Sequence, residues 1–350
     1  MHDNITNRKN IFLLEASRNA QLICIVTNDN LVELWKLNSK NEYTIFNTFN
    51  YYKKINKIPV LPVKIIKKFN KVRGVSISED AKTLVIFTNS GKINIYNIDI
   101  KKNGCELIDT ISQMNNNDKI KKIFILPVCK KIVVVYDSNL KEIYCVKQNG
   151  VYVFSQSIKN EFDICLFLTF SSNEKYFIET NISNKNILYK VNDHGLYKEY
   201  FSFNIENKKL INSLFLPENR YTIFVSYAGD IYLYSISKKK IVQKITYEKK
   251  RILDICLSND YTQILVLYND NTFYEYTFHN EVLIKKSQKF ALDKLPILVT
   301  KSLIITSKKI IALSSSFSKH ELTFCNFTDS KINTYGKAIL KIVKNNTLRE

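Results

Sequence analysis

Glycine is scarce in this chain of 350 residues, which contains only seven. The sequence has no G-x-G-x-x-G, G-K-S/T, G-x-S-x-G or H-E-x-x-H pattern. A loop that binds a nucleotide cofactor needs closely spaced glycines, because the backbone must approach the phosphates. We therefore expect no cofactor and no catalytic residue. An enzyme would require polar groups that converge at the centre of the fold, which the apolar segments do not indicate.

Paired cysteines and long apolar runs are lacking as well. The seven cysteines are well separated and include no C-x-x-C pair, which predicts buried, reduced thiols and no metal site. The first ten residues are polar, and the apolar run that follows them is too short for a signal peptide. The stretch ICLFLTF at 164–170 is too short to span a bilayer. We expect a protein of the nucleus or the cytoplasm with no membrane partner.

Negative charge is in short supply. Lys and Arg number 52 against 32 Asp and Glu, a formal net charge of +20. Such a balance favours contact with polyanions such as RNA or an acidic partner. Asn, Lys and Ile are abundant throughout the chain, so a biased nucleotide composition of the genome could also account for the lysines. Selection for a polyanionic partner and compositional bias both stay open.

A repeated pattern is what the sequence does contain. SGKINIYNI at 90–98 has the same layout as AGDIYLYSI at 228–236, and related stretches recur every 42 to 61 residues. These stretches end at Trp35, Tyr96, Tyr144, Tyr189, Tyr234, Tyr276 and Cys325.

Each repeat also contains short β-branched and aromatic runs bounded by turn residues. Examples are KTLVIFT at 82–88, YTIFVS at 221–226 and the earlier run VRGVSISED at 72–80. Runs of this kind predict strands joined by tight hairpins. Gly91 and Gly229 are expected to supply the positive φ of a two-residue hairpin turn. Three strands and a variable fourth per repeat predict an all-β, seven-bladed propeller over residues 1–330.

The chain resembles the WD40-repeat family over nearly its whole length, most clearly in residues 76–98. The Trp-Asp and Gly-His dipeptides of that family are missing, since Lys36 follows Trp35 and Asn97 follows Tyr96. We therefore expect the blades to be held mainly by packing, without the Asp and His hydrogen-bond network of the family.

Within that family the chain is similar to the non-catalytic WD-repeat subunit of the tRNA (guanine-N7) methyltransferase. The shared features are a basic insertion at 43–71 and TNISNKNIL at 180–188, which aligns with a charged fourth-blade motif. Ile182, Ser183, Asn184 and Asn186 replace charged residues of that motif, which leaves Lys185 as the charged residue of the segment. The resemblance implies that Lys185 and the nearby Lys190 contact a catalytic methyltransferase subunit in a heterodimer.

Further basic residues cluster near the ends of predicted strands, where they could gather on one rim of the propeller or lie at solvated hairpin tips. The candidates for contact with RNA phosphates are Lys238, Lys239, Lys240, Lys249, Lys250 and Arg251. The basic tail at 331–350 contains a stretch, 334–346, whose periodicity predicts a short amphipathic helix.

The sequence as a whole predicts a non-catalytic scaffold. In its specific form the hypothesis is a structural subunit that holds a tRNA methyltransferase in its active conformation and contacts tRNA. The alternative is a scaffold for ribosome biogenesis or another nuclear WD40 interaction protein.

Overall fold

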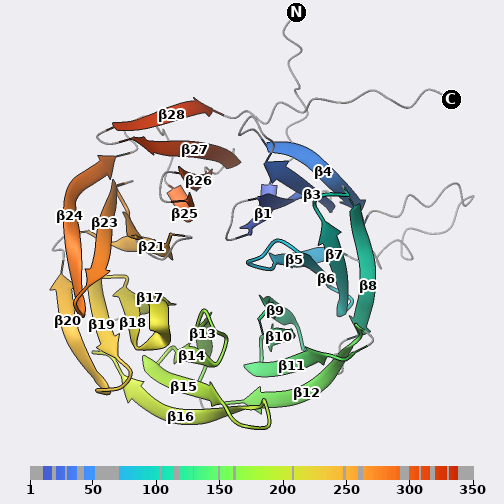
Figure 1. Cartoon of the computed structure of the whole chain (residues 1–350), viewed down its shortest axis with the longest axis horizontal. Coiled ribbons are helices and arrows are strands. Elements are labelled where there is room, and N and C mark those ends of the chain that lie inside the picture. Colours follow the sequence, from blue (N-terminus) through green and yellow to red (C-terminus); the bar gives the residue numbers. More distant parts are fainter. Residues whose placement is uncertain are drawn as a thin grey trace, which may run out of the picture. The chain divides into compact units, whose positions relative to one another are not determined.

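The structure is a computed structural model, and it describes most residues between Ile11 and Lys337. The described ranges are 11–17, 21–27, 30–37, 43–51, 71–102, 104–112, 118–128, 130–148, 150–160, 163–206, 209–246, 250–258, 263–270, 272–291, 299–306, 309–315, 320–328 and 331–337. They divide into two compact units, one ending at Ile158 and the other beginning at Lys159. Figure 1 shows that strands dominate both units. No helix among the described residues is long and apolar enough to cross a membrane.

The first unit contains three antiparallel four-stranded sheets, each formed by consecutive strands. The first sheet comprises β1 (Ile11–Ala16), β2 (Leu22–Thr27), β3 (Leu31–Leu37) and β4 (Tyr43–Asn50). The second comprises β5 (Val72–Ile77), β6 (Thr83–Thr88), β7 (Lys92–Asp99) and β8 (Gly104–Ser112). The third comprises β9 (Ile120–Leu126), β10 (Lys131–Tyr136), β11 (Leu140–Val146) and β12 (Tyr152–Lys159).

The second unit contains four sheets of the same design. Its strands are β13 (Cys165–Phe170), β14 (Tyr176–Asn181), β15 (Lys185–Val191) and β16 (Tyr197–Asn204), followed by β17 (Leu210–Phe215), β18 (Tyr221–Ser226), β19 (Asp230–Ser235) and β20 (Lys240–Thr246). Then come β21 (Ile252–Leu257), β22 (Ile264–Tyr268), β23 (Thr272–His279) and β24 (Val282–Ala291), and finally β25 (Val299–Thr306), β26 (Lys309–Ser315), β27 (His320–Thr328) and β28 (Lys331–Lys337). A three-residue 3-10 helix, η2 (Pro217–Asn219), links β17 to β18.

The repeat predicted from the sequence is confirmed strand by strand. All seven closing residues, from Trp35 to Cys325, lie on the third strand of a sheet. Within each unit the first strands of consecutive sheets contact one another, as β13, β17 and β21 do. Neighbouring sheets therefore pack face against face, and a sheet covered on both faces needs apolar residues at successive positions.

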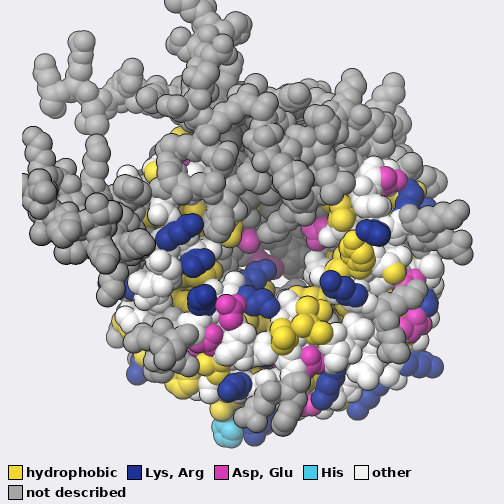
Figure 2. Space-filling view, turned by 180° about the vertical axis from the view of Figure 1, so that it is seen from behind, with side chains coloured by type: hydrophobic (Ala, Val, Ile, Leu, Met, Phe, Trp, Pro, Cys, Tyr) yellow, Lys and Arg dark blue, Asp and Glu magenta, His cyan; other side chains and the backbone are white. Residues whose placement is uncertain are grey.

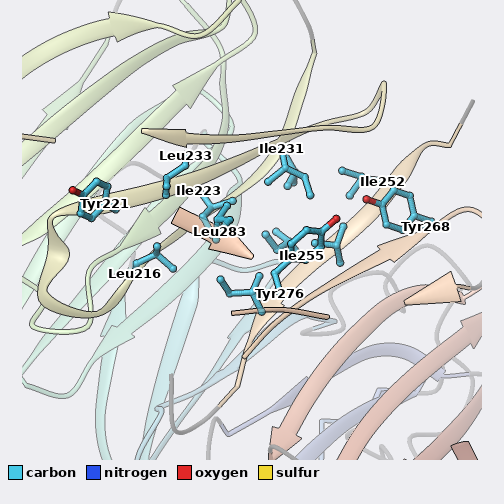
Figure 3. Close-up of a cluster of buried hydrophobic side chains, with 13 residues drawn as sticks. Leu216, Tyr221, Ile223, Ile231, Leu233, Ile252, Ile255, Tyr268, Tyr276 and Leu283 are labelled. Atoms are coloured by element: carbon cyan, nitrogen blue, oxygen red, sulfur yellow. The ribbon is translucent and has the colours of Figure 1, made fainter. Parts of the chain in front are cut away.

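The second strands show the consequence of this packing. Every residue of β2, β10 and β18 is buried. In Figure 3, Ile223 and Leu233 of one sheet lie in a cluster with Ile255 and Tyr276 of the next. The fourth strands have one covered face, so partly buried and exposed positions alternate along β16 from Phe201 to Asn204.

The hairpin turns explain how a chain with seven glycines builds so many reversals. Gly91 and Gly229 have positive φ values of 74° and 100°, as expected. Asn139 and Asn184 occupy the same turn position at 67° and 62°. Asparagine tolerates the left-handed region better than most residues, so it replaces glycine here.

The geometry of these turns differs from the two-residue type that we predicted. Gly91 donates its backbone N–H to the carbonyl of Thr88, and neither residue between them has positive φ. That combination fits a type I turn followed by a left-handed residue, the usual form of a three-residue hairpin loop.

Two segment boundaries in the structure differ from those predicted from the sequence. The predicted basic insertion at 43–71 begins with β4, so residues 43–50 belong to a sheet, and the lysines at 53–68 lie outside the described residues. At the other end, residues 331–337 form β28, which pairs with β27. The helix predicted at 334–346 is therefore wrong at 334–337, because these residues complete the last sheet. Residues 338–346 lie outside the described residues.

Candidate functional site

The basic residues chosen as candidates for RNA contact lie at the two opposite ends of β19. Lys238, Lys239 and Lys240 are in or next to the turn that follows β19. Arg251 contacts Tyr227, which lies in the turn that precedes β19. Lys249 lies outside the described residues. Of the two alternatives, a single rim does not hold for this set, because the preceding and following turns of an extended strand lie at its opposite ends.

Several of these side chains are occupied by contacts within the chain. Lys238 lies 2.8 Å from a carboxylate oxygen of Glu281, and the hydrogen bond from Lys238 to that carboxylate raises the pKa of Lys238. Lys250 lies 2.8 Å from Asp270 and also contacts the Tyr274 ring. Partial burial lowers the pKa of Lys250, but its hydrogen bonds raise the pKa on balance.

Two of the predicted residues from different segments meet at Tyr200. The ammonium of Lys190, on β15, lies 5.4 Å from the Tyr200 ring centroid, and that of Lys239 lies 5.9 Å from it. Lys239 also lies 4.9 Å from the Phe201 ring, and Lys190 lies 5.9 Å from the Tyr176 ring. We call these five residues the Tyr200 surface. The tyrosine itself is 53% exposed.

A β-bulge places Tyr200 on the surface. Leu188 pairs with Phe201 and Tyr189 pairs with Glu199, so Tyr200 is the extra residue of β16. Bulges of this kind redirect a side chain from its regular position. The same interruption falls at Val242 in β20, where a partly buried side chain occupies the bulge. The bulge is common to both sheets, and the exposed ring is particular to β16.

Lys185 lies at the opposite end of β15 from Lys190, so the two predicted partner-binding residues do not form one site. Near Lys185, Ile182 and Ile164 are each 54% exposed, and the Ile182 N–H donates to the Ile164 carbonyl at 2.9 Å. Tyr227 lies between β18 and β19 of the next sheet, and Arg251, directly before β21 of the sheet after it, donates to the Tyr227 hydroxyl at 2.7 Å and lies over its ring. We call Ile164, Ile182, Lys185, Tyr227 and Arg251 the hairpin-turn surface.

These residues belong to adjacent sheets that are joined by backbone contacts. The Asn184 side chain accepts from the backbone N–H of Leu210, at the start of β17. Leu210 pairs with Ser226, the residue before Tyr227. These contacts join the first two sheets of the second unit, and the contact of Arg251 with Tyr227 adds the third, so the hairpin-turn surface extends over three sheets. In Figure 2, Lys and Arg side chains lie among exposed hydrophobic side chains on the described surface.

In the segment 180–188, some side chains are buried and form hydrogen bonds within the sheet, and others are exposed to solvent. Thr180 donates to the Asn186 side chain at 2.7 Å, and both residues are buried. Ser183 donates to Asp163 on the surface. Ile182 and Lys185 are also exposed at this turn, so both can contact a partner.

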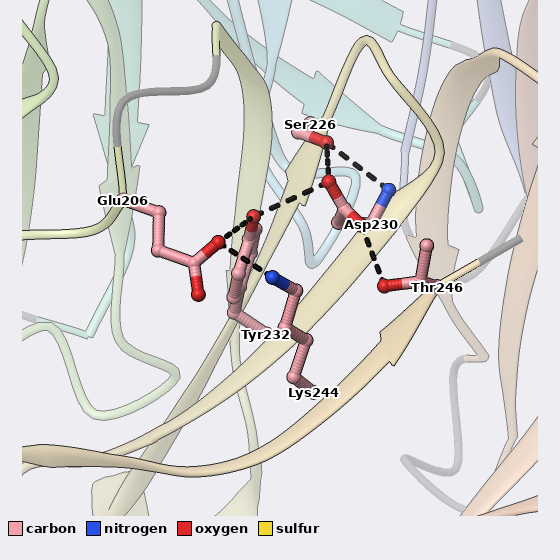
Figure 4. A network of polar contacts seen from close by, with 6 residues as sticks. All are labelled: Glu206, Ser226, Asp230, Tyr232, Lys244 and Thr246. Carbon is pink, nitrogen blue, oxygen red and sulfur yellow. Dashed lines mark hydrogen bonds and ion pairs between the residues drawn. The ribbon is translucent and has the colours of Figure 1, made fainter. Parts of the chain in front are cut away.

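Buried carboxylates form hydrogen-bond networks inside the sheets, in addition to the packing that we expected. Asp230 is fully buried and accepts hydrogen bonds from the hydroxyls of Ser226 and Thr246 at 3.2 and 2.7 Å (Figure 4). Tyr232 donates to both Asp230 and Glu206. Burial and these carboxylates raise the pKa of Tyr232, so its hydroxyl remains a donor. This network joins three strands of one sheet and the preceding loop.

A similar arrangement occurs in the first unit. Tyr136 and Tyr144 both donate to one carboxylate oxygen of Glu142, at 2.6 and 2.7 Å. In the first sheet, Trp35 donates to Glu33 at 3.2 Å. Both carboxylates lie two residues before the closing aromatic of their repeat. They accept hydrogen bonds inside the sheets, whereas the WD40-repeat family has an Asp and His network.

Among the described residues, no group of three or more His, Cys, Asp or Glu side chains is arranged to hold a metal ion. The buried Asp230 and Glu142 networks already have hydrogen-bond donors from the same sheets.

Comparisons with known proteins identify the fold. No protein-family model matches the sequence, and no curated protein matches it. Sqt1 of Saccharomyces cerevisiae is similar in structure, with a TM-score of 0.64 at 14% identity over 93% of this chain and 84% of that chain. A chain in the crystal structure of the mitotic checkpoint complex matches with a TM-score of 0.64 at 11% identity, covering 94% of this chain and 96% of that chain. Both are WD40 β-propeller proteins, so this all-β chain has the fold of that class.

Sequence reasoning missed Tyr200, Tyr227 and Ile164. Tyr200 lies in the variable fourth strand, where the sequence repeat does not show which residues pair with the third strand. Its exposure depends on the bulge. Tyr227 immediately precedes the AGDIYLYSI repeat, and its position at a turn tip was a usable signal. The contacts of Lys190 and Arg251 with these rings required the tertiary structure.

Proposed function

We propose that this chain is a non-catalytic WD40-type scaffold that binds a protein partner through the hairpin-turn surface. The observation that carries the proposal is the exposed Ile164 and Ile182 pair at one turn, with Tyr227 and Arg251 in contact at the corresponding turns of the following sheets. Tyrosine and arginine are enriched among the residues that dominate binding energy, and adjacent exposed apolar residues favour a protein interface. WD40 neighbours that act in protein complexes support the general role.

We further propose that the seven sheets are the blades of one propeller. Two solved WD40 structures each match more than nine tenths of the chain, which supports this arrangement. The blades would extend beyond the predicted limit of residue 330 to include β28.

The specific form of the proposal is the structural subunit of a tRNA (guanine-N7) methyltransferase complex. Its support is the resemblance at residues 180–188, where the exposed Ile182 and Lys185 belong to the hairpin-turn surface. Ile182 stands where the family motif is charged, so the contact would be more apolar than in the family. The alternative scaffold for ribosome biogenesis uses the same surface with another partner.

Two substitutions, one that reverses a charge and one that introduces a carboxylate, test whether the partner binds the hairpin-turn surface. We expect Ile182→Asp and Arg251→Glu each to reduce recovery of the dominant partner at least tenfold when the tagged chain is isolated from its native cells. A buried carboxylate without a partner is costly at an interface, and truncating an anchor residue commonly costs more than 1 kcal/mol. Quantitative mass spectrometry of the isolated complexes provides the measurement.

Ile284→Asp is the matched control, because Ile284 is a 47% exposed isoleucine on the outer strand β24. It should recover the partner as the unchanged chain does. Equal recovery by all three variants and the unchanged chain would show that the hairpin-turn surface is not the docking site.

The identity of the partner decides between the two scaffolds. If the specific form is right, a methyltransferase is recovered at one-to-one stoichiometry, and depletion of this chain removes 7-methylguanosine from tRNA. The measurement is nucleoside mass spectrometry of purified tRNA. Unchanged tRNA methylation with stalled pre-rRNA processing would contradict the methyltransferase form and favour ribosome biogenesis.

A further inference from the structure

The Tyr200 surface contains two lysines that have no carboxylate partner among the described residues. Lys190 and Lys239 are exposed, and their recorded contacts are with aromatic rings. By contrast, Lys238 and Lys244 each lie within 3 Å of a glutamate. The charges of Lys190 and Lys239 are therefore available to an external anion.

The ring that lies between these lysines is also available. Tyr200 is 53% exposed, and Phe201 lies 5.3 Å from it, centroid to centroid. The two ammonium groups lie within 6 Å of the Tyr200 centroid. An exposed aromatic face is thus flanked by positive charge on a small area of the second unit.

The chemistry of the ligand follows from this combination. An acidic peptide would satisfy the lysines and leave the tyrosine ring without a role. A single-stranded nucleic acid presents phosphates and planar bases in alternation, and proteins bind it with lysines along the backbone and aromatic rings under the bases. The formal net charge of +20 favours a polyanion as well.

We propose that the Tyr200 surface binds single-stranded RNA, with a base stacked on Tyr200 and phosphates held by Lys190 and Lys239. The surface lies at the end of β15 opposite Lys185 and the hairpin-turn surface. A protein partner and RNA can therefore bind at the same time. RNA binding does not depend on which protein, if any, occupies the hairpin-turn surface.

Fluorescence anisotropy with the purified full-length chain and a labelled 12-nucleotide single-stranded RNA tests the proposal. Tyr200→Ala should weaken binding about tenfold, and Tyr200→Phe should bind nearly as the unchanged chain does, because the ring is kept. The Lys190→Ala, Lys239→Ala double variant should lower the slope of log K against log salt by about 1.4, since each phosphate contact on a single strand contributes about 0.7.

The control is the double variant Lys92→Ala, Lys209→Ala, which removes the same charge from two other exposed positions. It should leave both the affinity and the salt slope close to those of the unchanged chain. Circular dichroism checks that each variant keeps its β signal. Ultraviolet crosslinking of the unchanged chain to the RNA gives a second measurement, in which peptides containing Lys190, Tyr200 or Lys239 should carry the crosslink.

Three results would overturn the proposal. The first is equal RNA affinity of the unchanged chain, Tyr200→Ala and the Lys190, Lys239 double variant. The second is crosslinking confined to other peptides. The third is binding of labelled poly-glutamate with the same dependence on Tyr200 and no binding of RNA, which would make the surface a site for acidic protein segments.

Discussion

Glu142→Ala is expected to lower the free energy of unfolding of the first unit by about 2 to 6 kcal/mol. Glu142 is 4% exposed and accepts the hydroxyl hydrogen bonds of Tyr136 and Tyr144. Both tyrosines are buried, so the variant leaves two donors without this acceptor. Each unsatisfied buried group costs about 1 to 3 kcal/mol.

Trp35 provides the measurement. It is the single tryptophan of the chain, it is buried, and it belongs to the same unit as Glu142. Urea unfolding followed by its fluorescence reports the stability of that unit. Glu142→Gln should lose less stability than Glu142→Ala, because the amide oxygen can still accept. A midpoint for Glu142→Ala equal to that of the unchanged chain would show that the buried carboxylate does not stabilise the sheet.

Gly74→Ala is expected to lower the free energy of unfolding of the first unit by about 1 to 3 kcal/mol, which is the usual cost of inserting an atom into a packed core. Gly74 pairs with Phe87 across β5 and β6. A Cβ at position 74 would lie 2.2 Å from Cζ and 2.4 Å from Cε1 of Phe87. The Phe87 ring is 4% exposed and packs in a core cluster, so it cannot move away freely.

Gly104→Ala is the matched control in the same sheet. A Cβ at position 104, at the start of β8, would have no atom within 4 Å. Its stability should remain within about 0.5 kcal/mol of the unchanged chain, as for surface substitutions. Combining Gly74→Ala with Phe87→Leu should recover part of the loss, because the shorter side chain leaves space. Equal midpoints for Gly74→Ala and Gly104→Ala would contradict the steric explanation.

The strands of the fold were predictable because each repeat carries its own local signals. The all-buried strand β18 reads YTIFVS, and the turn before β19 contains Gly229, so the continuous β-branched and aromatic run agrees with the turn chemistry. The C-terminal helix was mispredicted at 334–337. An apolar periodicity in a short segment does not distinguish a helix from an outer strand, and pairing with β27 decides for the strand.

The candidate sites were predictable in part. Lys190 and Lys239 were chosen from the sequence for different reasons, as a partner contact and as an RNA contact. The structure brings both to Tyr200, 39 residues before Lys239 in the sequence. It also separates Lys185 from Lys190, because five residues of extended chain carry them to opposite ends of β15.

The sequence by itself determined the repeat, the strand positions and the left-handed turns at Gly91 and Gly229, because these depend on residues close together in the chain. The tertiary structure decided which side chains meet on the surface and which polar groups are satisfied inside. The bulge that exposes Tyr200 and the carboxylate of Glu142 between two tyrosines depend on cross-strand register. A bulge adds one residue to a single strand and shifts the pairing beyond it, and a local pattern with a period of two residues does not show where that shift falls.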